Sequence, residues 1–323
     1  MSNYNIKNDM NIRKIARYII YQPRLFFSLT LRRIPFSKQI QAFLPDRIYI
    51  KHIFRLCHGY ELNLKHPQTF SEKLQWLKLY NHRPEYIKMV DKYEAKKYVS
   101  SLIGEKYIIP TLGVYKNAEE IDWKSLPNQF VLKCTHDSGG VIICKDKSLF
   151  DIEQAKCRLR KSLRHDYYLN GREWPYKGVP RRIIAEKYIA TSTNGISKDL
   201  FDYKFFCFNG KVQFFKIDFG RFSEHRANYY SREGIFQNFG ETVCPKKKDA
   251  NIQLPDNLEL MIKLSETLSK GEPFLRVDFY DVNGNVYFGE LTFYPSSGFG
   301  KWDKPEADLM LGRLLQLPSK HSR

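Results

Sequence analysis

The stretch from Arg276 to Gly298, RVDFYDVNGNVYFGELTFYPSSG, decides the fold of this 323-residue chain. Asn283-Gly284 is a dipeptide typical of two-residue hairpin turns, and strand-like apolar runs precede and follow it. In such a hairpin Asp278 and Glu290 lie on paired strands at comparable distances from the turn, and we expect their side chains to converge on one face. The stretch therefore predicts an antiparallel strand pair that carries two facing carboxylates.

The two carboxylates point to a metal site. Facing carboxylates repel each other unless a cation lies between them, and a hard divalent ion bound by carboxylate and phosphate oxygens is the usual solution. Mg²⁺ is the ion expected by default. Arg276, two residues before Asp278, points to the same face, where its guanidinium can stabilise charge on a transferring phosphoryl group. A strand pair with solvent-facing carboxylates explains the hairpin, taken alone, equally well.

The rest of the chain reads as α+β, with a helical N-terminal part followed by antiparallel strands. Apolar residues at 70, 74, 77 and 80 follow one face of a helix over 70–80, and Gly104 is expected to end a second helix over 86–103. Asn209-Gly210 predicts a second hairpin turn. Further helices are expected at 151–164 and 257–270, and strands at 130–134, 141–144, 183–189, 203–208, 212–219, 274–279 and 286–291.

Lys133 leaves a strand just before a loop of small and polar residues, Thr135 to Gly140, which contains Ser138 and Gly139. An ammonium group meets the charge of a phosphate, and the backbone N–H groups of such a loop can wrap its oxygens. The loop is not a Walker A motif, because the lysine precedes the glycines. His136 is a candidate contact to phosphate or substrate, although a loop histidine is more often incidental.

Two further segments are weak when taken alone. Glu186-Lys187-Tyr188-Ile189 places an acid at the end of a strand and would pass as an edge strand. Asp202-Tyr203-Lys204 places a second lysine on a strand, where lysines are usually solvated.

Composition limits the class of protein. Hydrophobic residues make up 42% of the chain and aromatic residues 15%, which is enough for a sizeable core and excludes wholesale disorder. No pair of the six cysteines has CxxC spacing, so free thiols in a reducing compartment are expected. The net charge of +18 suits an anionic substrate, an anionic membrane surface or nucleic acid. Because no helix-turn-helix, RRM or KH pattern is present, we expect no nucleic-acid partner.

Residues 1–44 form a basic, amphipathic N-terminal segment. Eight lysines and arginines stand against one acid, Asp9, between residues 1 and 40. The apolar run is too short to span a bilayer, and no small-residue cleavage site follows it. The segment predicts either a helix on an anionic membrane interface or a helix packed on the domain. The expected location is the cytoplasm. If the segment lies on a membrane interface, we expect peripheral association at the inner face of the cytoplasmic membrane.

Taken in order, these segments resemble the ATP-grasp superfamily, and most closely its TupA-like family, which is linked to teichuronopeptide, capsule and other surface-polysaccharide synthesis. The resemblance covers about residues 45–300, and such a series in one order is specific. The matching phrases are PQTFSEKLQW at 67–76, DKY at 91–93, LPNQFVLK at 126–133, the 135–140 loop, residues 202–210 and GELTFYP at 289–295.

The resemblance implies an ATP-grasp fold in which two α+β subdomains with antiparallel sheets enclose an ATP cleft behind a helical N-terminal region. It divides the chain into the segment 1–44, a helical N-terminal ATP-grasp region at 45–125, a small subdomain with phosphate loop and hinge at 126–190, and a C-terminal subdomain with the Mg²⁺ site at 191–323.

The resemblance also implies a role for each matching residue. Lys133 resembles the lysine on the α- and β-phosphates. The Mg²⁺ ligands are implied at Asp278 and Glu290. Thr292 stands where an Asn is common, so a weaker donor takes the third metal position and the number of Mg²⁺ ions, one or two, stays open. The remaining implied roles are phosphate covering for Thr135, Ser138, Gly139 and Gly140, adenine binding for Glu186, Lys187, Tyr188 and Ile189, and catalysis for Arg276, Lys204 and His136.

The implied activity is that of an ADP-forming carboxylate–amine ligase that uses ATP and Mg²⁺ through an acyl-phosphate. Its expected partners are an anionic sugar, or a lipid-linked or polymeric glycan, and an amino acid, joined during surface-polysaccharide synthesis. The alternative is a glycosyltransferase or sugar kinase of the same pathway, in which the two carboxylates would hold a sugar-nucleotide diphosphate through Mg²⁺.

Overall fold

The computed structural model describes residues 42–189, 191–193, 196–198, 200–220, 224–250 and 252–319. The predicted basic segment 1–44 therefore lies almost entirely outside the described residues. The described chain divides into two compact units, one built from 42–81, 201–277 and 292–319 and the other from 82–200 and 278–291. The four segments expected from the resemblance are each continuous in sequence, whereas each of the two units is assembled from separate ranges of the chain.

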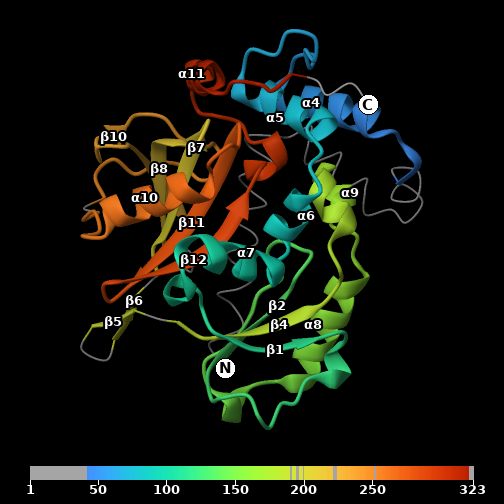
Figure 1. Ribbon diagram of the computed structural model, residues 1–323, viewed down its shortest axis with the longest axis vertical. Helices are drawn as coiled ribbons and strands as arrows, with labels where there is room; N and C mark the ends of the chain where they lie inside the picture. The colour runs from blue at the N-terminus through green and yellow to red at the C-terminus, as the bar shows by residue number, and fades with distance from the viewer. Residues whose placement is uncertain are drawn as a thin grey trace. The chain divides into compact units, whose positions relative to one another are not determined.

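The first unit holds β7 to β10 and the start of β11 of a six-stranded sheet, whose strand order is β10-β9-β8-β7-β11-β12 (Figure 1). Its hairpin turns are those that the sequence predicts: Asn209 and Gly210 have φ values of 50° and 76°, and Asn283 and Gly284 have 53° and 79°. Positive φ at both central residues is the requirement of a type I′ turn. The strands are β7 (Asp202–Phe208), β8 (Lys211–Phe219), β9 (Arg226–Ser231), β10 (Phe236–Gln237), β11 (Phe274–Val282) and β12 (Asn285–Thr292), and residues 278–291 of the last hairpin belong to the second unit.

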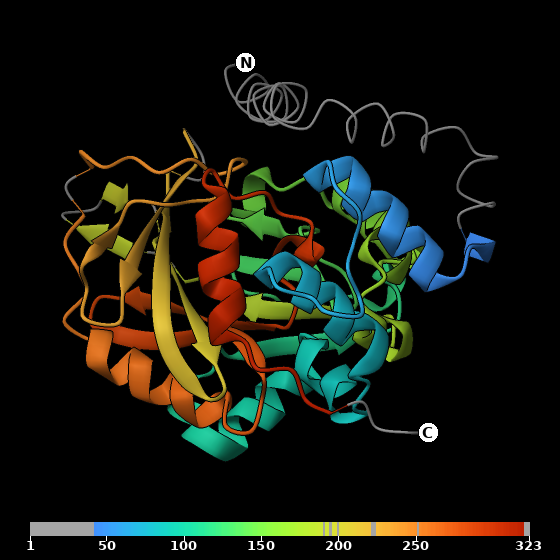
Figure 2. The same cartoon turned by 90° about the horizontal axis from the view of Figure 1, so that it is seen from above.

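Helices cover this sheet. α10 (Leu258–Leu268) lies along β7 and β8, and Cys207 of β7 donates to the carbonyl of Ser265 at 3.8 Å (Figures 1 and 2). The ring of Phe206, the residue before Cys207, meets that of Phe274. The other helical elements of this unit are α4 (Asp46–His58), α5 (Phe70–Tyr80), η5 (Pro295–Gly298) and α11 (Pro305–Leu314).

α5 matches the helix predicted over 70–80. Thr69 accepts a hydrogen bond from the backbone of Glu72, and the Glu72 carboxylate accepts from the backbone of Thr69, which completes a capping box. Phe70 is buried among the aromatic rings of Phe208 and Phe274. The local cap and the apolar face together explain why the sequence identifies this helix correctly.

The second unit is built on a four-stranded antiparallel sheet with the order β1-β4-β2-β3. α8 (Ile152–Arg164) covers it and buries Ala155 and Leu159 against Phe130 and Leu132. The predicted pairing of the strands near 130 and 142 is confirmed. The strands are β1 (Thr111–Tyr115), β2 (Phe130–Cys134), β3 (Ile142–Cys144) and β4 (Ile183–Lys187), the short pair is β5 (Thr191–Thr193) with β6 (Ile196–Lys198), and the short helices are η1 (Glu105–Tyr107), η2 (Ala118–Glu120), η3 (Lys147–Leu149), α9 (Tyr168–Gly171) and η4 (Trp174–Gly178).

The prediction of one helix over 86–103 is wrong. The segment forms two helices, α6 (Glu85–Val90) and α7 (Glu94–Ile103). Asp91 breaks the helix because its carboxylate accepts hydrogen bonds from the backbone N–H groups of Tyr93 and Glu94, at 2.8 and 3.3 Å. An aspartate that bonds to the backbone ahead of it offers the chain an alternative to the helix.

Two expectations about the whole chain can be compared with the structure. All six cysteines carry free thiols, as their spacing predicts. Within the described ranges, none of the helices combines the length and the apolar character that crossing a membrane requires.

Candidate functional site

Lys133 and Glu186 face each other across β2 and β4. Val131 is paired with Glu186 in the sheet, so Lys133, two residues further along β2, points to the same side. The Lys133 ammonium lies 2.5 Å from one oxygen of the Glu186 carboxylate, and the Lys96 ammonium lies 2.5 Å from the other. Lys96 also donates to the carbonyl of Ile109 at 2.6 Å. One buried carboxylate thus fixes two lysines.

The electrostatics of this cluster follow from burial and charge. Burial alone would raise the pKa of Glu186, but the Lys133 and Lys96 ammonium groups overcome it and lower the pKa to about 2. Burial alone would lower the pKa of Lys133, but Glu186, with Tyr280 and Glu290, raises it above its usual value. Lys133 therefore stays positively charged, as a phosphate-binding lysine must. With its carboxylate occupied by lysines, Glu186 leaves adenine binding mainly to the residues after it, and its own adenine role stays a prediction.

Lys92 is a third cation of the site, which the sequence analysis did not assign. Its ammonium donates to the carbonyl of Asp137 in the loop after β2 and lies 3.8 Å from the carboxylate of the same residue. Burial lowers the pKa of Lys92, while Asp137 and Glu290 oppose the shift. In the sequence Lys92 belongs to the DKY motif at 91–93, but the neighbouring residues do not indicate that its side chain reaches the loop after β2.

The loop after β2 presents some of its residues and buries others. Ser138 and Gly139 are exposed, and Gly139 has a φ of +87°, which favours glycine. A Cβ on Gly140 would lie 2.5 Å from a carboxylate oxygen of Asp137, so a side chain there would displace that carboxylate. The loop is therefore open to a ligand at Ser138 and Gly139, as expected for a phosphate-covering loop.

Thr135 and His136 point inward instead. The Thr135 hydroxyl donates to the carbonyl of Pro180 at 2.7 Å, and Thr135 is fully buried. A ring nitrogen of His136 lies 3.2 Å from the carbonyl oxygen of His165, and burial lowers the pKa of this histidine. Both residues hold the root of the loop, and their predicted contacts with nucleotide or substrate stay predictions.

A cavity of about 470 Å³ opens at the end of β4 in the second unit. The backbone segment predicted to hold adenine, Lys187-Tyr188-Ile189, forms one wall. Ile108, Pro110 and Val282 supply apolar surface, which suits a flat aromatic base. The complete lining is Glu105, Lys106, Ile108, Pro110, Lys187, Tyr188, Ile189, Val282 and Tyr287.

The predicted metal ligands lie on the β11–β12 hairpin. Asp278 is buried and Glu290 is exposed. A Cβ on Gly289, the residue before Glu290, would lie 3.1 Å from the carbonyl oxygen of Asp278, so the two strands pass close together here. Both residues offer the hard carboxylate oxygens that Mg²⁺ prefers beside the waters it retains. That they bind one ion together stays a prediction. Thr292, at the end of β12, is half-buried and belongs to the first unit.

The first unit carries a second charged cluster on its sheet. Lys204 is buried and paired with Asp202 at 2.6 Å, so it is not the solvated strand lysine that is usual for this residue type. Lys216 is paired with Lys204 in the register of β7 and β8, and its ammonium lies 2.8 Å from Glu241 and 3.5 Å from Asp218.

Charge compensation inside this cluster is nearly complete. Although burial alone would lower the pKa of Lys216, the carboxylates of Asp218 and Glu241 raise it well above its usual value. Arg276, which is also buried, opposes that shift, so its guanidinium adds positive charge to the same region. Lys204 and Arg276 are candidates from the sequence, whereas Lys216 becomes evident only from the strand register.

Comparison with protein families matches residues 72–316 to the family described as TupA-like ATP-grasp. This match spans most of the chain, including all of the residues of the two clusters. The chain belongs to the TupA-like ATP-grasp family. Its membership confirms the family that the sequence resembles and the predicted ATP-grasp fold. A search of curated proteins gives no match.

Solved structures to which this chain is similar match it at low sequence identity. They include the D-alanine–D-alanine ligase from Bacillus anthracis complexed with ATP, with 17% identity over 64% of this chain and 54% of that one and a TM-score of 0.35. The D-alanine–D-alanine ligase from Helicobacter pylori has 16% identity over 79% and 68%, with a TM-score of 0.41. D-Cycloserine synthetase has 16% identity over 72% and 71%, with a TM-score of 0.39. The chain thus spans little more than half of the Bacillus ligase.

Proposed function

We propose that this TupA-like ATP-grasp protein is an ADP-forming ligase that activates a carboxylate with ATP and joins it to an amine. The observation that supports the proposal best is the cluster in which Glu186 fixes Lys133 and Lys96 beside an open glycine loop. The cluster supplies fixed positive charge, and the loop supplies exposed backbone at Ser138 and Gly139. Positive charge and backbone N–H groups are the two features that bind a polyphosphate. The cavity at Lys187–Ile189 accounts for the base of the same nucleotide.

In this proposal each group has a defined task. Adenine enters the cavity beside Tyr188, and Lys133, Lys92 and the 138–140 backbone bind the phosphates. Asp278 and Glu290, with Thr292 as a weaker oxygen donor, would hold Mg²⁺, which neutralises phosphate charge when bound.

The chemical step is a phosphoryl transfer followed by an acyl transfer. A carboxylate oxygen attacks the γ-phosphorus, and the bond to the leaving ADP oxygen breaks. An amine then attacks the acyl carbon, phosphate leaves, and the amine loses a proton. Arg276 and Lys204 stay the predicted catalytic cations of this step, and the protein acts mainly by positioning and charge stabilisation.

The substrates in the proposal are an acidic sugar, free or as part of a lipid-linked or polymeric glycan, and an amino acid. The net charge of +18 supports anionic substrates, and the family membership supports a role in surface-polysaccharide synthesis. The same charge supports a cytoplasmic protein that associates peripherally with an anionic membrane surface.

Two measurements test the proposal. Binding of Mg-ATP, followed by calorimetry, should weaken at least about tenfold in Asp278→Asn and in Glu290→Gln, because each removes one charge from the metal site. Asp281→Asn is the matched control, since Asp281 lies on the same hairpin and caps the turn by accepting from Gly284 N–H at 3.0 Å. Unaltered Mg-ATP binding in both variants would show that the metal assignment is wrong.

The second measurement identifies the products. Wild-type protein supplied with ATP, uronates and amino acids should release ADP and phosphate. Release of AMP and pyrophosphate would exclude the acyl-phosphate route. If UDP-sugars rather than ATP raise the thermal unfolding temperature of the protein, the glycosyltransferase alternative is favoured.

A further inference from the structure

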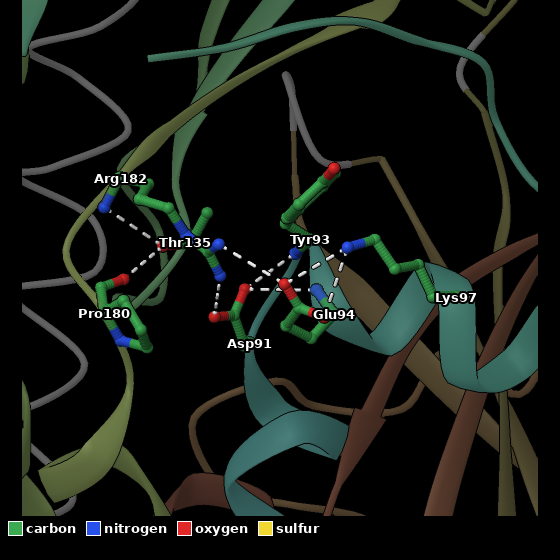
Figure 3. Close-up of polar contacts among 7 residues, drawn as sticks. All are labelled: Asp91, Tyr93, Glu94, Lys97, Thr135, Pro180 and Arg182. Atoms are coloured by element: carbon green, nitrogen blue, oxygen red, sulfur yellow. Dashed lines mark hydrogen bonds and ion pairs between the residues drawn. The ribbon is translucent and has the colours of Figure 1, made fainter. Parts of the chain in front are cut away.

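Arg182 lies in the segment before β4 and binds the turn that carries Lys92. Its guanidinium donates to the carboxylate of Asp91 at 2.6 Å and to that of Glu94 at 3.3 Å, and it lies over the ring of Tyr93 at 5.0 Å (Figure 3). Asp91 is 1% exposed, so this is a buried ion pair. A planar guanidinium can serve two carboxylates and an aromatic ring at once, which a lysine cannot.

Thr135 connects Arg182 to the phosphate loop. The backbone N–H of Thr135 donates to the carbonyl of Arg182 at 2.8 Å, and the N–H of Arg182 donates to the Thr135 hydroxyl at 3.2 Å (Figure 3). The backbone N–H of Lys92 in turn donates to the carbonyl of Thr135 at 3.2 Å. The contacts close a ring from Asp91 through Arg182 and Thr135 to Lys92, which follows Asp91 in the chain.

This ring joins three segments that are far apart in sequence: the α6–α7 turn, the root of the phosphate loop and the entry to β4. The Lys92 ammonium and the exposed 138–140 backbone both extend from it. The guanidinium of Arg182 is paired with Asp91 and Glu94 and points toward the α6–α7 turn (Figure 3). Arg182 therefore holds the groups proposed to bind phosphate in place and does not offer its own guanidinium to the ligand.

We infer that Arg182 and Asp91 are positioning residues that set the Lys92 ammonium and the phosphate loop in register for the phosphates of a nucleotide. The inference rests on the proposed function of this site and adds a support that acts through Lys92. It predicts that breaking the pair lowers affinity for the phosphates and leaves affinity for the base unchanged.

The test compares ATP with adenosine, both measured by calorimetry on the full chain. Arg182→Gln should weaken ATP binding about tenfold, equal to about 1.4 kcal/mol, and leave adenosine binding unchanged. Asp91→Asn should do the same while keeping an oxygen that accepts from the Tyr93 and Glu94 N–H groups, so it serves if Arg182→Gln does not fold. Arg181→Gln is the matched control, because Arg181 bonds to the carbonyl of Leu163 and to Asp166 at the surface.

A double-mutant cycle separates positioning from folding. Lys92→Met alone should weaken ATP binding, and Arg182→Gln added to it should cost little more, because the support then has nothing to position. Full additivity of the two changes, equal losses for ATP and adenosine, or no loss of ATP binding would each overturn the inference. If the wild-type protein itself fails to bind ATP, the proposed function fails and the inference falls with it.

Discussion

Glu186 and Lys133 lie on neighbouring strands of one sheet, offset diagonally by two residues on the same face, and form an ion pair of 2.5 Å. The glutamate is nearly fully buried, whereas the lysine keeps 22% of its side-chain surface exposed. The pair therefore has one end in the core and one end toward solvent. This is the arrangement expected of a lysine that must be held rigidly and still meet a ligand.

Replacing Glu186 by glutamine is expected to destabilise the protein by about 3 kcal/mol, because it leaves the ammonium groups of Lys96 and Lys133 without a countercharge. Urea unfolding measures the change. Glu119→Gln is the control, since the Glu119–Arg160 pair is exposed and should contribute less than about 1 kcal/mol. Equal effects of the two substitutions would contradict the structural role given to Glu186.

The same carboxylate predicts a dependence of stability on pH. The pKa of Glu186 falls to about 2 in the folded protein, against about 4.3 in an unfolded chain. A group with a lowered folded pKa stabilises the fold above its unfolded pKa, and this contribution is lost as the pH falls toward the folded value.

The difference in unfolding free energy between wild type and Glu186→Gln should therefore be constant above about pH 5 and shrink between about pH 4 and pH 2. Unfolding measured at a series of pH values checks this. A difference that grows as the pH falls would contradict the assigned direction.

The hairpins and the first helix could be predicted because their signals are local. Asn209-Gly210 and Asn283-Gly284 specify type I′ turns, and Thr69 with Glu72 caps α5 without help from distant residues. The ordered series of short phrases then indicated the family.

The break between α6 and α7 and the roles of Lys216 and Lys92 were not predicted, because each depends on a contact with a residue elsewhere in the chain. Asp91 ends α6 in part because Arg182, 91 residues away, binds its second oxygen. Lys216 is a cluster residue only because β8 aligns it with Lys204, and Lys92 only because the chain brings it to Asp137. No short window of sequence contains both partners of the Asp91 and Lys92 contacts. Lys216 lies in the same predicted hairpin as Lys204, but the register of that hairpin shifts between Phe206 and Cys207, which the turn residues do not indicate.

Lys216 provides a stability prediction in the first unit. Lys216→Met is expected to cost about 3 to 5 kcal/mol, because it leaves the buried carboxylates of Asp218 and Glu241 without their cation. Lys211→Met, on the same strand, removes an exposed partner of Glu266 and should cost less than about 1 kcal/mol. Comparable losses in the two variants, measured by chemical unfolding, would show that the buried cluster does not depend on Lys216.

Gly139 and Gly271 offer a matched pair that separates backbone strain from ligand binding. They have φ values of +87° and +80°, and a Cβ on either would meet open space. An alanine at either position should therefore destabilise the protein by a similar amount, about 1 kcal/mol. Only Gly139→Ala should also weaken ATP binding, because only Gly139 lies in the proposed phosphate loop and its new methyl group shields the backbone N–H groups. Thermal unfolding and calorimetric titration with ATP measure the two effects, and unchanged ATP affinity in Gly139→Ala would exclude this loop as the phosphate contact.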